Sequence, residues 1–595
     1  MRACCSLFVA LCIACAHCLS QSPAATPASQ ASAAPDLIFL NAVIYTGEGF
    51  SDDEPQTVQA VAIGDGKVLA IGNNDEIRSL AGPKTRIRDL NSAQTGVVLF
   101  PGFNDAHLHL GAAAQNFMNL DLTGVKSLAE MLAKIEIYAR NAPPGHWLTG
   151  GNWDHTLWPD KKLPTREDLD RVTQGHPAFL SRIDGHITIA NTAALQAAGI
   201  TGKTVPPLGA AIDLDANGEP TGILRESAQQ LVEKVIPPAS RDERRRGLEL
   251  AMADAVAHGI TSVQDFSDWD DFLIYEEMEK QGKLDIRITE WLPFKEPLSV
   301  EENQRAHHPA TDPMLHTGFL KGFMDGSLGS RTAALKAPYA DDPGNFGLPQ
   351  YSQAELNQMS VERARAGFQL GFHAIGDKAV EMALDAIESA EMLGTPPPCR
   401  SPGQSYRIWD EKAPCASPRD RIEHAQVVDP ADIPRFARLG VIASMQPCHL
   451  LTDMNWAESR LGAKRAAYSY AWKAFLDAGV RLAFGTDYPV EPISPFRGLY
   501  AAVTRMNEAG TKTYFPQNKI SRGEALHAYT QGSAFAEFAE KSKGKLIPGY
   551  DADFIVVDRD LFTVSPAALL HAKVLETWVG GQQVFVANMH IESAR

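Results

Sequence analysis

The sequence has few cysteines after its first 20 residues and no dense cluster of basic residues. Five of the eight cysteines lie in those 20 residues, so only Cys399, Cys415 and Cys448 remain in the rest of the chain. Their spacing is typical neither of a zinc ribbon nor of a redox-active pair. The formal net charge of −17, with no basic face, argues against nucleic acid as a partner.

The sequence also lacks an apolar run long enough to cross a membrane at its N-terminus. The run Leu7–Ala16 is too short for a span. An early arginine before it and small residues after it are typical of a secretory signal peptide over residues 1–20. We therefore expect an exported protein, periplasmic or secreted; lipidation of Cys15 or Cys18 is the alternative. Residues 21–35, rich in Pro, Ala, Ser and Gln, predict a disordered linker.

Two of the remaining cysteines flank a proline-rich insertion, "PPPCRSPGQSYRIWDEKAPCASP". They are Cys399 and Cys415. An exported location permits a disulfide between them, and we expect one; two free thiols are the alternative.

Eight short apolar runs alternate with helical patterns through the middle of the chain. They are "GVVLFPGFNDAHLH", "GITSVQDF", "DIRITEWLPF", "GFLKGFMDG", "FQLGFHAIGD", "RDRIEHAQV", "VIASMQPC" and "VRLAFGTDYP". Segments such as "RDERRRGLELAMADAVAHG" lie between them and have an apolar spacing of about 3.6 residues. Strands that alternate with helices form parallel sheets, and eight of them close a barrel. We therefore expect an α/β protein with a (β/α)₈ TIM-like barrel.

Other segments extend this barrel. Alternating apolar residues around Gly and Asp turns in residues 36–95 and 545–595 predict one small β-sandwich built from both termini. The first barrel strand is expected within residues 96–111, and the rest of the barrel within 241–544. Residues 112–240 are too many for a structureless loop, so they predict an inserted subdomain over one barrel mouth.

Polar residues that can bind a metal occur at the ends of several predicted strands. They are His107 and His109 on the first strand, Lys321 on the fourth, His373 on the fifth, His424 on the sixth and Asp487 on the eighth. The carboxyl ends of barrel strands converge on one mouth, so these side chains are expected to meet. Each alone could be a turn, cap or core residue. Together they predict a site for one or two divalent ions, since imidazole and carboxylate are usual zinc ligands.

Several stretches, in their order along the chain, resemble the amidohydrolase superfamily, and most closely its amidohydrolase family 3 branch, which includes N-substituted formamide deformylases. They are "PGFNDAHLHLG", "GNWDHTLWP", "RIDGHITIANTAAL", "GILRESA", "LKGFMDGSLGSRTAAL", "FHAIGDKAV", "RIEHAQ", "FGTDYPVEP" and "PGYDADFIVVDRD". The resemblance covers residues 36–588. It implies that His107, His109 and Asp487 bind one metal ion, that His373 and His424 bind a second, and that Lys321 bridges them as a carbamate. Zinc is the expected metal. An uncarboxylated Lys321 would repel a cation and favour a single ion.

The resemblance further implies hydrolysis of a carbon–nitrogen bond of amide, N-formyl or N-acyl type. A bound divalent ion lowers the pKa of water towards about 7, and Asp487 could move the proton to the leaving nitrogen. A deaminase or a hydrolase of lactones, carbamates or phosphoesters is the alternative among enzymes. An exported binding protein on a hydrolase scaffold is the alternative of another class.

The expected substrate contacts come mainly from the inserted subdomain. Candidates are Trp153, His155 and Trp158 for an aromatic wall, Arg182, Asp184 and His186 for polar contacts, and Arg225 or Arg331 for a substrate carboxylate. The alternative is that the tryptophans are core residues and the arginines pair with local acids. The substrate is expected to be a small molecule, and a homodimer is left open.

Overall fold

The computed structural model describes residues 34–182, 187–207, 210–394 and 418–587. The expected signal peptide, most of the expected linker and the expected Cys399–Cys415 disulfide lie outside these residues, as do Asp184 and His186. Cys448 is a free, buried thiol. Among the described residues, no helix combines the length and the apolar character that crossing a membrane requires.

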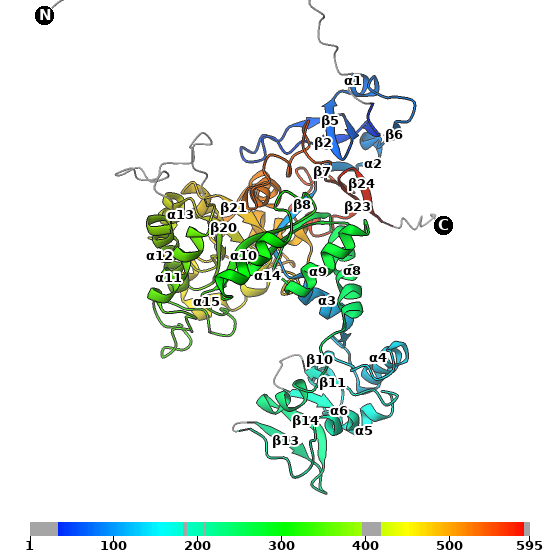
Figure 1. Cartoon of the computed structure of the whole chain (residues 1–595), viewed down its shortest axis with the longest axis vertical. Helices are drawn as coiled ribbons and strands as arrows, with labels where there is room; N and C mark the ends of the chain where they lie inside the picture. The colour runs from blue at the N-terminus through cyan, green and yellow to red at the C-terminus, as the bar shows by residue number, and fades with distance from the viewer. Residues whose placement is uncertain (1–33, 183–186, 208–209, 395–417, 588–595) are drawn as a thin grey trace, which may run out of the picture.

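A sheet of eight parallel strands lies at the centre of the molecule (Figure 1). In chain order the strands are β8 (Phe103–Leu108), β15 (Ile260–Asp265), β16 (Arg287–Pro293), β17 (Leu315–Phe323), β18 (Leu370–Ala374), β19 (Arg421–His424), β20 (Ile442–Met445) and β21 (Leu482–Phe484). Each strand pairs with the next one along the chain. Seven of the eight strands fall within the apolar runs of the sequence, and β17 begins three residues before its run and overlaps it. This agreement confirms the expected TIM-like barrel.

The two edge strands of this sheet approach each other through their carboxyl ends. The backbone N–H of Asp487 donates to the carbonyl of His107 at 2.7 Å. The carboxylate of Asp105 accepts from the backbone N–H of Thr486 at 3.0 Å and from its hydroxyl at 2.6 Å. These bonds nearly close the barrel, and they bring Asp487 beside the end of the first strand.

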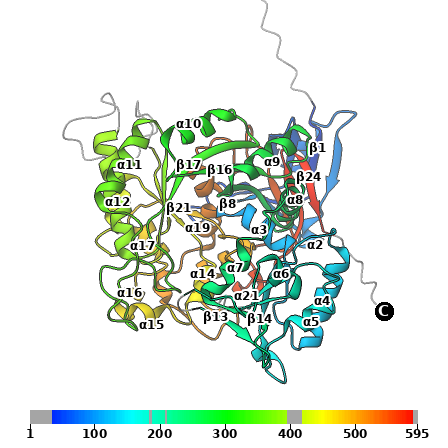
Figure 2. The ribbon, with the colours of Figure 1, turned by 60° about the horizontal axis from the view of Figure 1, so that its bottom comes forward.

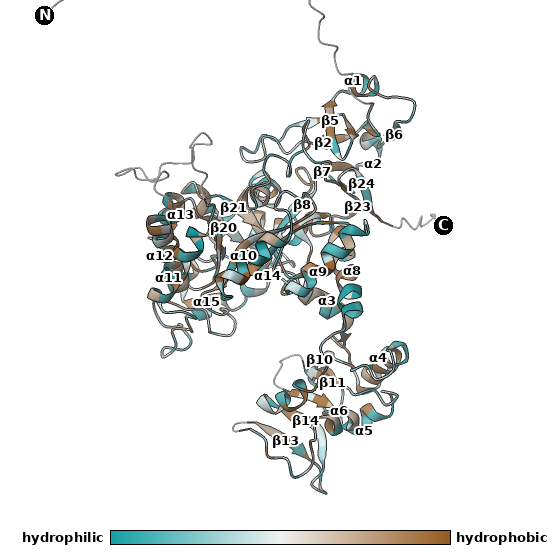
Figure 3. Ribbon diagram, in the orientation of Figure 1, coloured by the Kyte–Doolittle hydropathy of each residue, from teal (hydrophilic) through white to brown (hydrophobic). Residues whose placement is uncertain are grey.

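Helices cover the outside of the barrel. They include α8 (Arg241–Ala257), α9 (Trp269–Lys280), α10 (Leu298–His307), α11 (Gln353–Arg365), α12 (Asp377–Gly394), α13 (Ile433–Leu439), α17 (Trp472–Asp477) and α18 (Pro495–Thr504). The α8 helix begins with a capping box between Ser240 and Glu243, which satisfies backbone N–H groups at its first turn. Its apolar residues, among them Leu248 and Met252, are buried, whereas Figure 3 shows much of α8 to be hydrophilic.

Segments from both termini form a two-sheet sandwich. One sheet has the order β5 (Lys67–Gly72), β4 (Ala60–Gly64), β1 (Leu37–Leu40), β6 (Arg86–Asp89). The other has the order β24 (Gln582–Val586), β23 (Val574–Val579), β22 (Phe554–Val557), β7 (Val98–Pro101), β2 (Val43–Tyr45), β3 (Thr57–Val58). Phe39 of the first sheet packs edge-on against Phe554 and Trp578 of the second. The sandwich therefore combines the two ends of the chain.

The apolar run that contains the first expected barrel strand is divided by Gly102. Val98–Pro101 forms β7 and pairs with β22 in the sandwich, whereas Phe103–Leu108 forms β8 and pairs with β15 in the barrel. A Cβ atom on Gly102 would lie 2.3 Å from the side chain of Thr261, so a side chain has no room at this point. The stretch 96–111 thus serves both the sandwich and the barrel.

The segment between β8 and β15 holds a third folded part. Its six-stranded sheet has the order β13 (Ala211–Leu214), β14 (Pro220–Arg225), β12 (Ile187–Ala190), β11 (Phe179–Arg182), β10 (Gly150–Trp153), β9 (Leu120–Asp121). The helices α4 (Leu128–Asn141), α5 (Arg166–Asp170) and α6 (Thr192–Ala197) accompany it. Figures 1 and 2 show this part beyond α3 (Leu110–Met118), and Figure 1 places it on the side away from the terminal sandwich.

Candidate metal centre

Three of the expected ligands converge at the carboxyl end of the barrel strands. His107 lies in β8 and is fully buried, and His109 precedes α3. The Oδ1 atom of Asp487 lies 3.1 Å from Nε2 of His109 and 3.6 Å from Nε2 of His107. One ligand atom from each of the three residues can be chosen so that all lie within 4.8 Å of one another.

The two imidazoles are oriented by contacts at their other ring nitrogen. Nδ1 of His107 lies 2.7 Å from Oε2 of Glu423, and Nδ1 of His109 lies 3.0 Å from the carbonyl of Phe266. A proton at Nδ1 in each contact leaves the Nε2 lone pair directed at the shared centre. Carboxylate and carbonyl acceptors of this kind commonly orient metal-binding histidines.

The other expected histidines complete the same mouth. The ring centroid of His424 lies 4.5 Å from that of His373 and 4.8 Å from that of His107. Nδ1 of His424 lies 2.7 Å from Oε1 of Gln446, and Nε2 of His373 lies 3.2 Å from the carbonyl of Gly326. The four histidines and the aspartate chosen from the sequence thus lie at one end of the barrel, and each contacts another of the five.

The structure adds His449, which the sequence analysis did not predict. It begins α14 (His449–Asp453), after β20, and its Nε2 lies 3.0 Å from Oδ2 of Asp487. His424, His449 and Asp487 form a second group whose ligand atoms lie within 4.8 Å. The sequence feature that could have identified His449 is its place just beyond the seventh apolar run, at the same end of the barrel as the other ligands.

Lys321 is buried among aromatic rings and faces an imidazole. Its Nζ lies 3.2 Å from Nε2 of His107, and 4.8 Å from the ring centroid of Trp291. Burial lowers the pKa of this amine to about 8, although the carboxylates of Glu423 and Asp487 oppose the shift. The side chain therefore holds a larger fraction of neutral amine near neutral pH than an exposed lysine does.

The electrostatics of the mouth favour neutral imidazoles beside an ionised carboxylate. Burial is the main cause that holds the pKa values of His107 and His424 well below the usual range. Burial alone would raise the pKa of Asp487, but the neighbouring His107, His109 and His449 outweigh it and hold that pKa well below its usual range. Neutral imidazole and carboxylate are the protonation states that bind a divalent ion.

Two ligand candidates have an unusual backbone conformation. His424 has φ of 71° and Asp487 has φ of 61°, both in the left-handed region that non-glycine residues rarely adopt. Such conformations are held by the surrounding structure and are common where function requires a particular side-chain direction. Here they redirect the chain at the ends of β19 and β21.

Acidic neighbours of the histidines differ in what they contact. Glu423 adjoins His424 in sequence, but its carboxylate contacts His107 and accepts from Nε of Arg421 at 2.8 Å. Asp377 lies close to His373 in sequence, but its carboxylate accepts the backbone N–H of Lys336 at 2.9 Å. Adjacency in sequence therefore does not identify the orienting carboxylate.

The expected substrate-binding residues have local contacts. The indole N–H of Trp153 donates to the carbonyl of Leu180 at 2.9 Å and that of Trp158 to Val125 at 3.1 Å, with both rings buried in the insert. The three arginines expected to bind substrate form ion pairs: Arg182 with Asp154, Arg225 with Asp213 and Arg331 with Asp341. Nε of Arg182 also lies 3.3 Å from Nδ1 of His155. A role in substrate binding stays a prediction for these residues.

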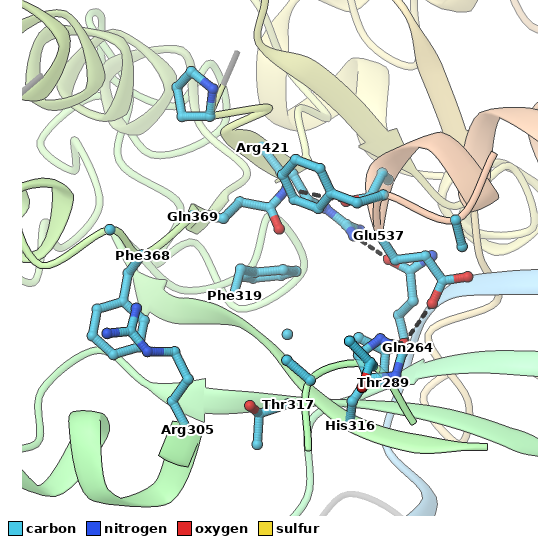
Figure 4. Close-up of a pocket in the computed structure, with 18 of the residues that line it drawn as sticks. Gln264, Thr289, Arg305, His316, Thr317, Phe319, Phe368, Gln369, Arg421 and Glu537 are labelled. Atoms are coloured by element: carbon cyan, nitrogen blue, oxygen red, sulfur yellow. Dashed lines mark hydrogen bonds between the residues drawn. The ribbon is translucent and has the colours of Figure 1, made fainter. Parts of the chain in front are cut away.

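A large cavity of about 830 Å³ opens at the opposite end of the barrel (Figure 4). His316, near the start of β17, and Arg421, at the start of β19, line it. Lys321 and His424 lie nearer the other ends of the same two strands. The cavity is therefore separated from the candidate metal centre by the barrel interior.

Comparison with known proteins agrees with this geometry. A model of the family described as "Amidohydrolase family" matches residues 95–585. The putative amidohydrolase YtcJ of Bacillus subtilis is 34% identical over 90% of this chain and 97% of its own. The N-substituted formamide deformylase of Arthrobacter pascens is 28% identical over 92% of this chain and 97% of its own sequence. A metal-dependent hydrolase from Pyrococcus furiosus superposes with a TM-score of 0.71 at 30% identity, over 89% of this chain and 100% of its own.

Proposed function

Because the chain belongs to the amidohydrolase family, we propose that it uses its barrel mouth to hydrolyse a carbon–nitrogen bond in a small amide of N-formyl or N-acyl type. The observation that carries the proposal is the position of Asp487, which contacts His109 on one side and His449 on the other. The name of the Arthrobacter relative makes N-substituted formamides the first compounds to try.

The donor set fits a divalent ion, and zinc is the metal we propose. His107, His109 and Asp487 would hold one ion, and His373 and His424 a second, since buried neutral imidazoles and an ionised carboxylate are what zinc binds. A divalent ion at such a site supplies Lewis-acid chemistry, which lowers the pKa of water towards about 7 and polarises a carbonyl.

Lys321 would join the two ion positions after carboxylation. Its neutral amine would attack CO₂, a new N–C bond would form, and the amine would release a proton to water. The product is an anionic two-oxygen ligand, whereas the ammonium form of Lys321 would repel a cation. The buried setting of this amine, with its pKa lowered to about 8, supplies the neutral form that the reaction needs.

Asp487 is the residue we assign to proton transfer. Its ionised carboxylate would take a proton from the attacking water and give it to the leaving nitrogen. The contact of its Oδ2 with Nε2 of His449, at 3.0 Å, fixes the direction of the carboxylate during both transfers. His449 is thus a positioning residue for the same reaction.

The proposal is tested by turnover of N-formyl and N-acyl compounds, with amine, acid and ammonia measured separately. We expect the zinc-loaded protein to release amine and acid in equal amounts. Asp487→Asn should lower kcat by about 10²–10⁴-fold, because proton transfer by a positioned group contributes that much. His571→Asn, at an exposed position between α21 (Pro566–Leu569) and β23, is a surface control and should keep full activity. Release of ammonia alone, or cleavage only of esters or lactones, would contradict an amide substrate.

Export is a separate part of the proposal and rests on the composition of residues 1–20. Cell fractionation should recover the protein outside the cytoplasm, and the mature chain should begin near residue 20. A chain that stays in the cytoplasm with Met1 attached would contradict export. A membrane-bound mature chain that begins at Cys15 or Cys18 would support the lipid-anchored alternative.

A further inference from the structure

A further group of side chains that could bind a metal lies away from the barrel mouth. It consists of Glu279 in the last turn of α9, His308 directly after α10, and Asp312 in the segment that leads into β17. One ligand atom from each lies within 4.8 Å of the other two. Nothing in the proposed reaction uses these residues, so the group needs its own explanation.

The imidazole of His308 has a buried nitrogen without a hydrogen-bond partner. His308 is only 8% exposed, and its Nε2 is buried and makes no hydrogen bond. That atom lies 3.6 Å from Oε2 of Glu279 and 3.5 Å from Oδ2 of Asp312. Both separations are too long for a good hydrogen bond, so the nitrogen lies beside both carboxylates without being satisfied by either.

The other ring nitrogen of His308 is occupied. Nδ1 lies 3.1 Å from Oε1 of Glu276, whose second oxygen pairs with Lys280 at 3.0 Å. A proton on Nδ1 satisfies the contact with Glu276 and leaves a lone pair on Nε2. This carboxylate–imidazole arrangement is the one that orients metal-binding histidines in proteins.

The two carboxylates of the group also lie close to each other. Burial raises the pKa of Glu279, and the negative charge of Asp312 raises it further. Two carboxylates and an imidazole lone pair that face one another repel unless a cation lies among them or Glu279 and Asp312 share a proton. The geometry matches such a cation, because tetrahedral ligands about 2.0–2.1 Å from zinc lie roughly 3.4 Å apart.

We propose that His308, Glu279 and Asp312 form a divalent-metal site, suited to Zn²⁺, that is separate from the ion positions at the barrel mouth. The side chains of Glu279 and Asp312 are 21% and 25% exposed, so water can complete the coordination. An ion there links the end of α9 to the segment before β17, the strand that carries Lys321. Its expected role is stability of the barrel rather than turnover.

The competing explanation is a protonated His308 that forms ion pairs with both carboxylates without any metal. The two explanations differ in metal content. The full-length protein is loaded with Zn²⁺, passed through a desalting column and analysed for zinc per chain. His308→Gln and Glu279→Gln should each hold one zinc ion per chain fewer than the unchanged protein.

His571→Gln is the matched control, because it changes the same residue type at an exposed position outside the group. It should keep the zinc content of the unchanged protein. After chelation, added Zn²⁺ should raise the Tm of the unchanged protein and the control more than that of the two variants. Equal zinc content in all four proteins would overturn the proposal. Because the experiment measures zinc content rather than turnover, its result does not depend on whether the protein hydrolyses amides.

Discussion

At Glu423 a single buried carboxylate connects the barrel interior to the candidate metal centre. One oxygen accepts from Nε of Arg421 at 2.8 Å, and the other contacts Nδ1 of His107 at 2.7 Å. Arg421 is held in turn by the hydroxyl of Ser444 and the carbonyl of Ala106, each at 2.8 Å. The direction of the His107 ring is therefore set by residues that lie below the mouth.

Glu423→Gln should weaken metal binding at the barrel mouth. The neutral amide loses the charge that stabilises His107 with its proton on Nδ1, and loss of such an orienting partner typically lowers metal affinity about 10–100-fold. Competition with a chelator measures the change. Glu302→Gln, at an exposed position in α10, is the control and should bind metal normally. Unchanged affinity in Glu423→Gln would contradict an orienting role.

The sequence predicted strand ends better than it predicted contacts between them. His107, His109, His373, His424 and Asp487 could be chosen because apolar runs mark where barrel strands end. His449 was missed since it lies in a helix, one residue past such a run. The contact between Glu423 and His107 joins residues on separate strands, and the left-handed backbone at His424 is invisible to periodicity.

At the scale of elements, the close approach of the edge strands β8 and β21 sets the position of Asp487 relative to the histidines. We call this contact between the two strands the seam. Gly485 lies in this seam, where a Cβ atom would be 2.5 Å from the backbone nitrogen of His107 and 2.7 Å from Oδ1 of Asp105. The first contact is with backbone, which cannot move aside without shifting the strand. The close approach of the two strands therefore requires glycine at this position.

Gly485→Ala should loosen the seam. We expect the free energy of unfolding to fall by about 1–3 kcal/mol, as is usual when an extra carbon is forced into a packed interior. Urea denaturation measures the loss, and zinc content should fall with it because His107 and Asp487 are displaced. Gly344→Ala is the control: a Cβ there meets nothing within 4 Å. Equal stability of the two variants would show that the seam tolerates a side chain.

The boundary between β7 and β8 marks what apolar patterns leave undetermined. All eight strands were expected from their apolar runs, but the run around Gly102 was expected to form barrel strand alone. Its residues are buried on both sides of Gly102, so neither composition nor periodicity changes where β7 ends and β8 begins. Only the strands with which they pair distinguish the two segments: β7 pairs with β22 of the sandwich, and β8 pairs with β15 of the barrel.

At the scale of the whole molecule, charged side chains connect the three folded parts. Nδ1 of His146, in the insert, lies 2.8 Å from Oε1 of Glu243 in α8. Arg287, at the start of β16, binds Asp553, directly before β22, with its Nε at 2.6 Å and its Nη2 at 2.9 Å. The latter pair is buried and joins the barrel to the terminal sandwich.

Arg287→Met should destabilise the whole chain, because it leaves the buried carboxylate of Asp553 without its cation. Breaking a buried pair in this way typically costs about 3–5 kcal/mol. Denaturant unfolding, followed in parallel by tryptophan fluorescence and circular dichroism, measures the loss. Arg78→Met, at an exposed position in α1 (Asn74–Arg78), is the control and should change stability by no more than about 0.5 kcal/mol.

The double variant Arg287→Met/Asp553→Asn tests the physical reason for this loss. Removing the unpaired negative charge of Asp553 should recover part of the stability, because the main penalty is an uncompensated buried carboxylate rather than a lost attraction. Asp551, 3.6 Å from Arg287 and 2.6 Å from Lys67, keeps a cation of its own and should not cancel the recovery. If the double variant is no more stable than Arg287→Met, the uncompensated charge of Asp553 is not the cause of the loss, and the contact of this carboxylate with the backbone N–H of Gly580 at 2.7 Å matters more.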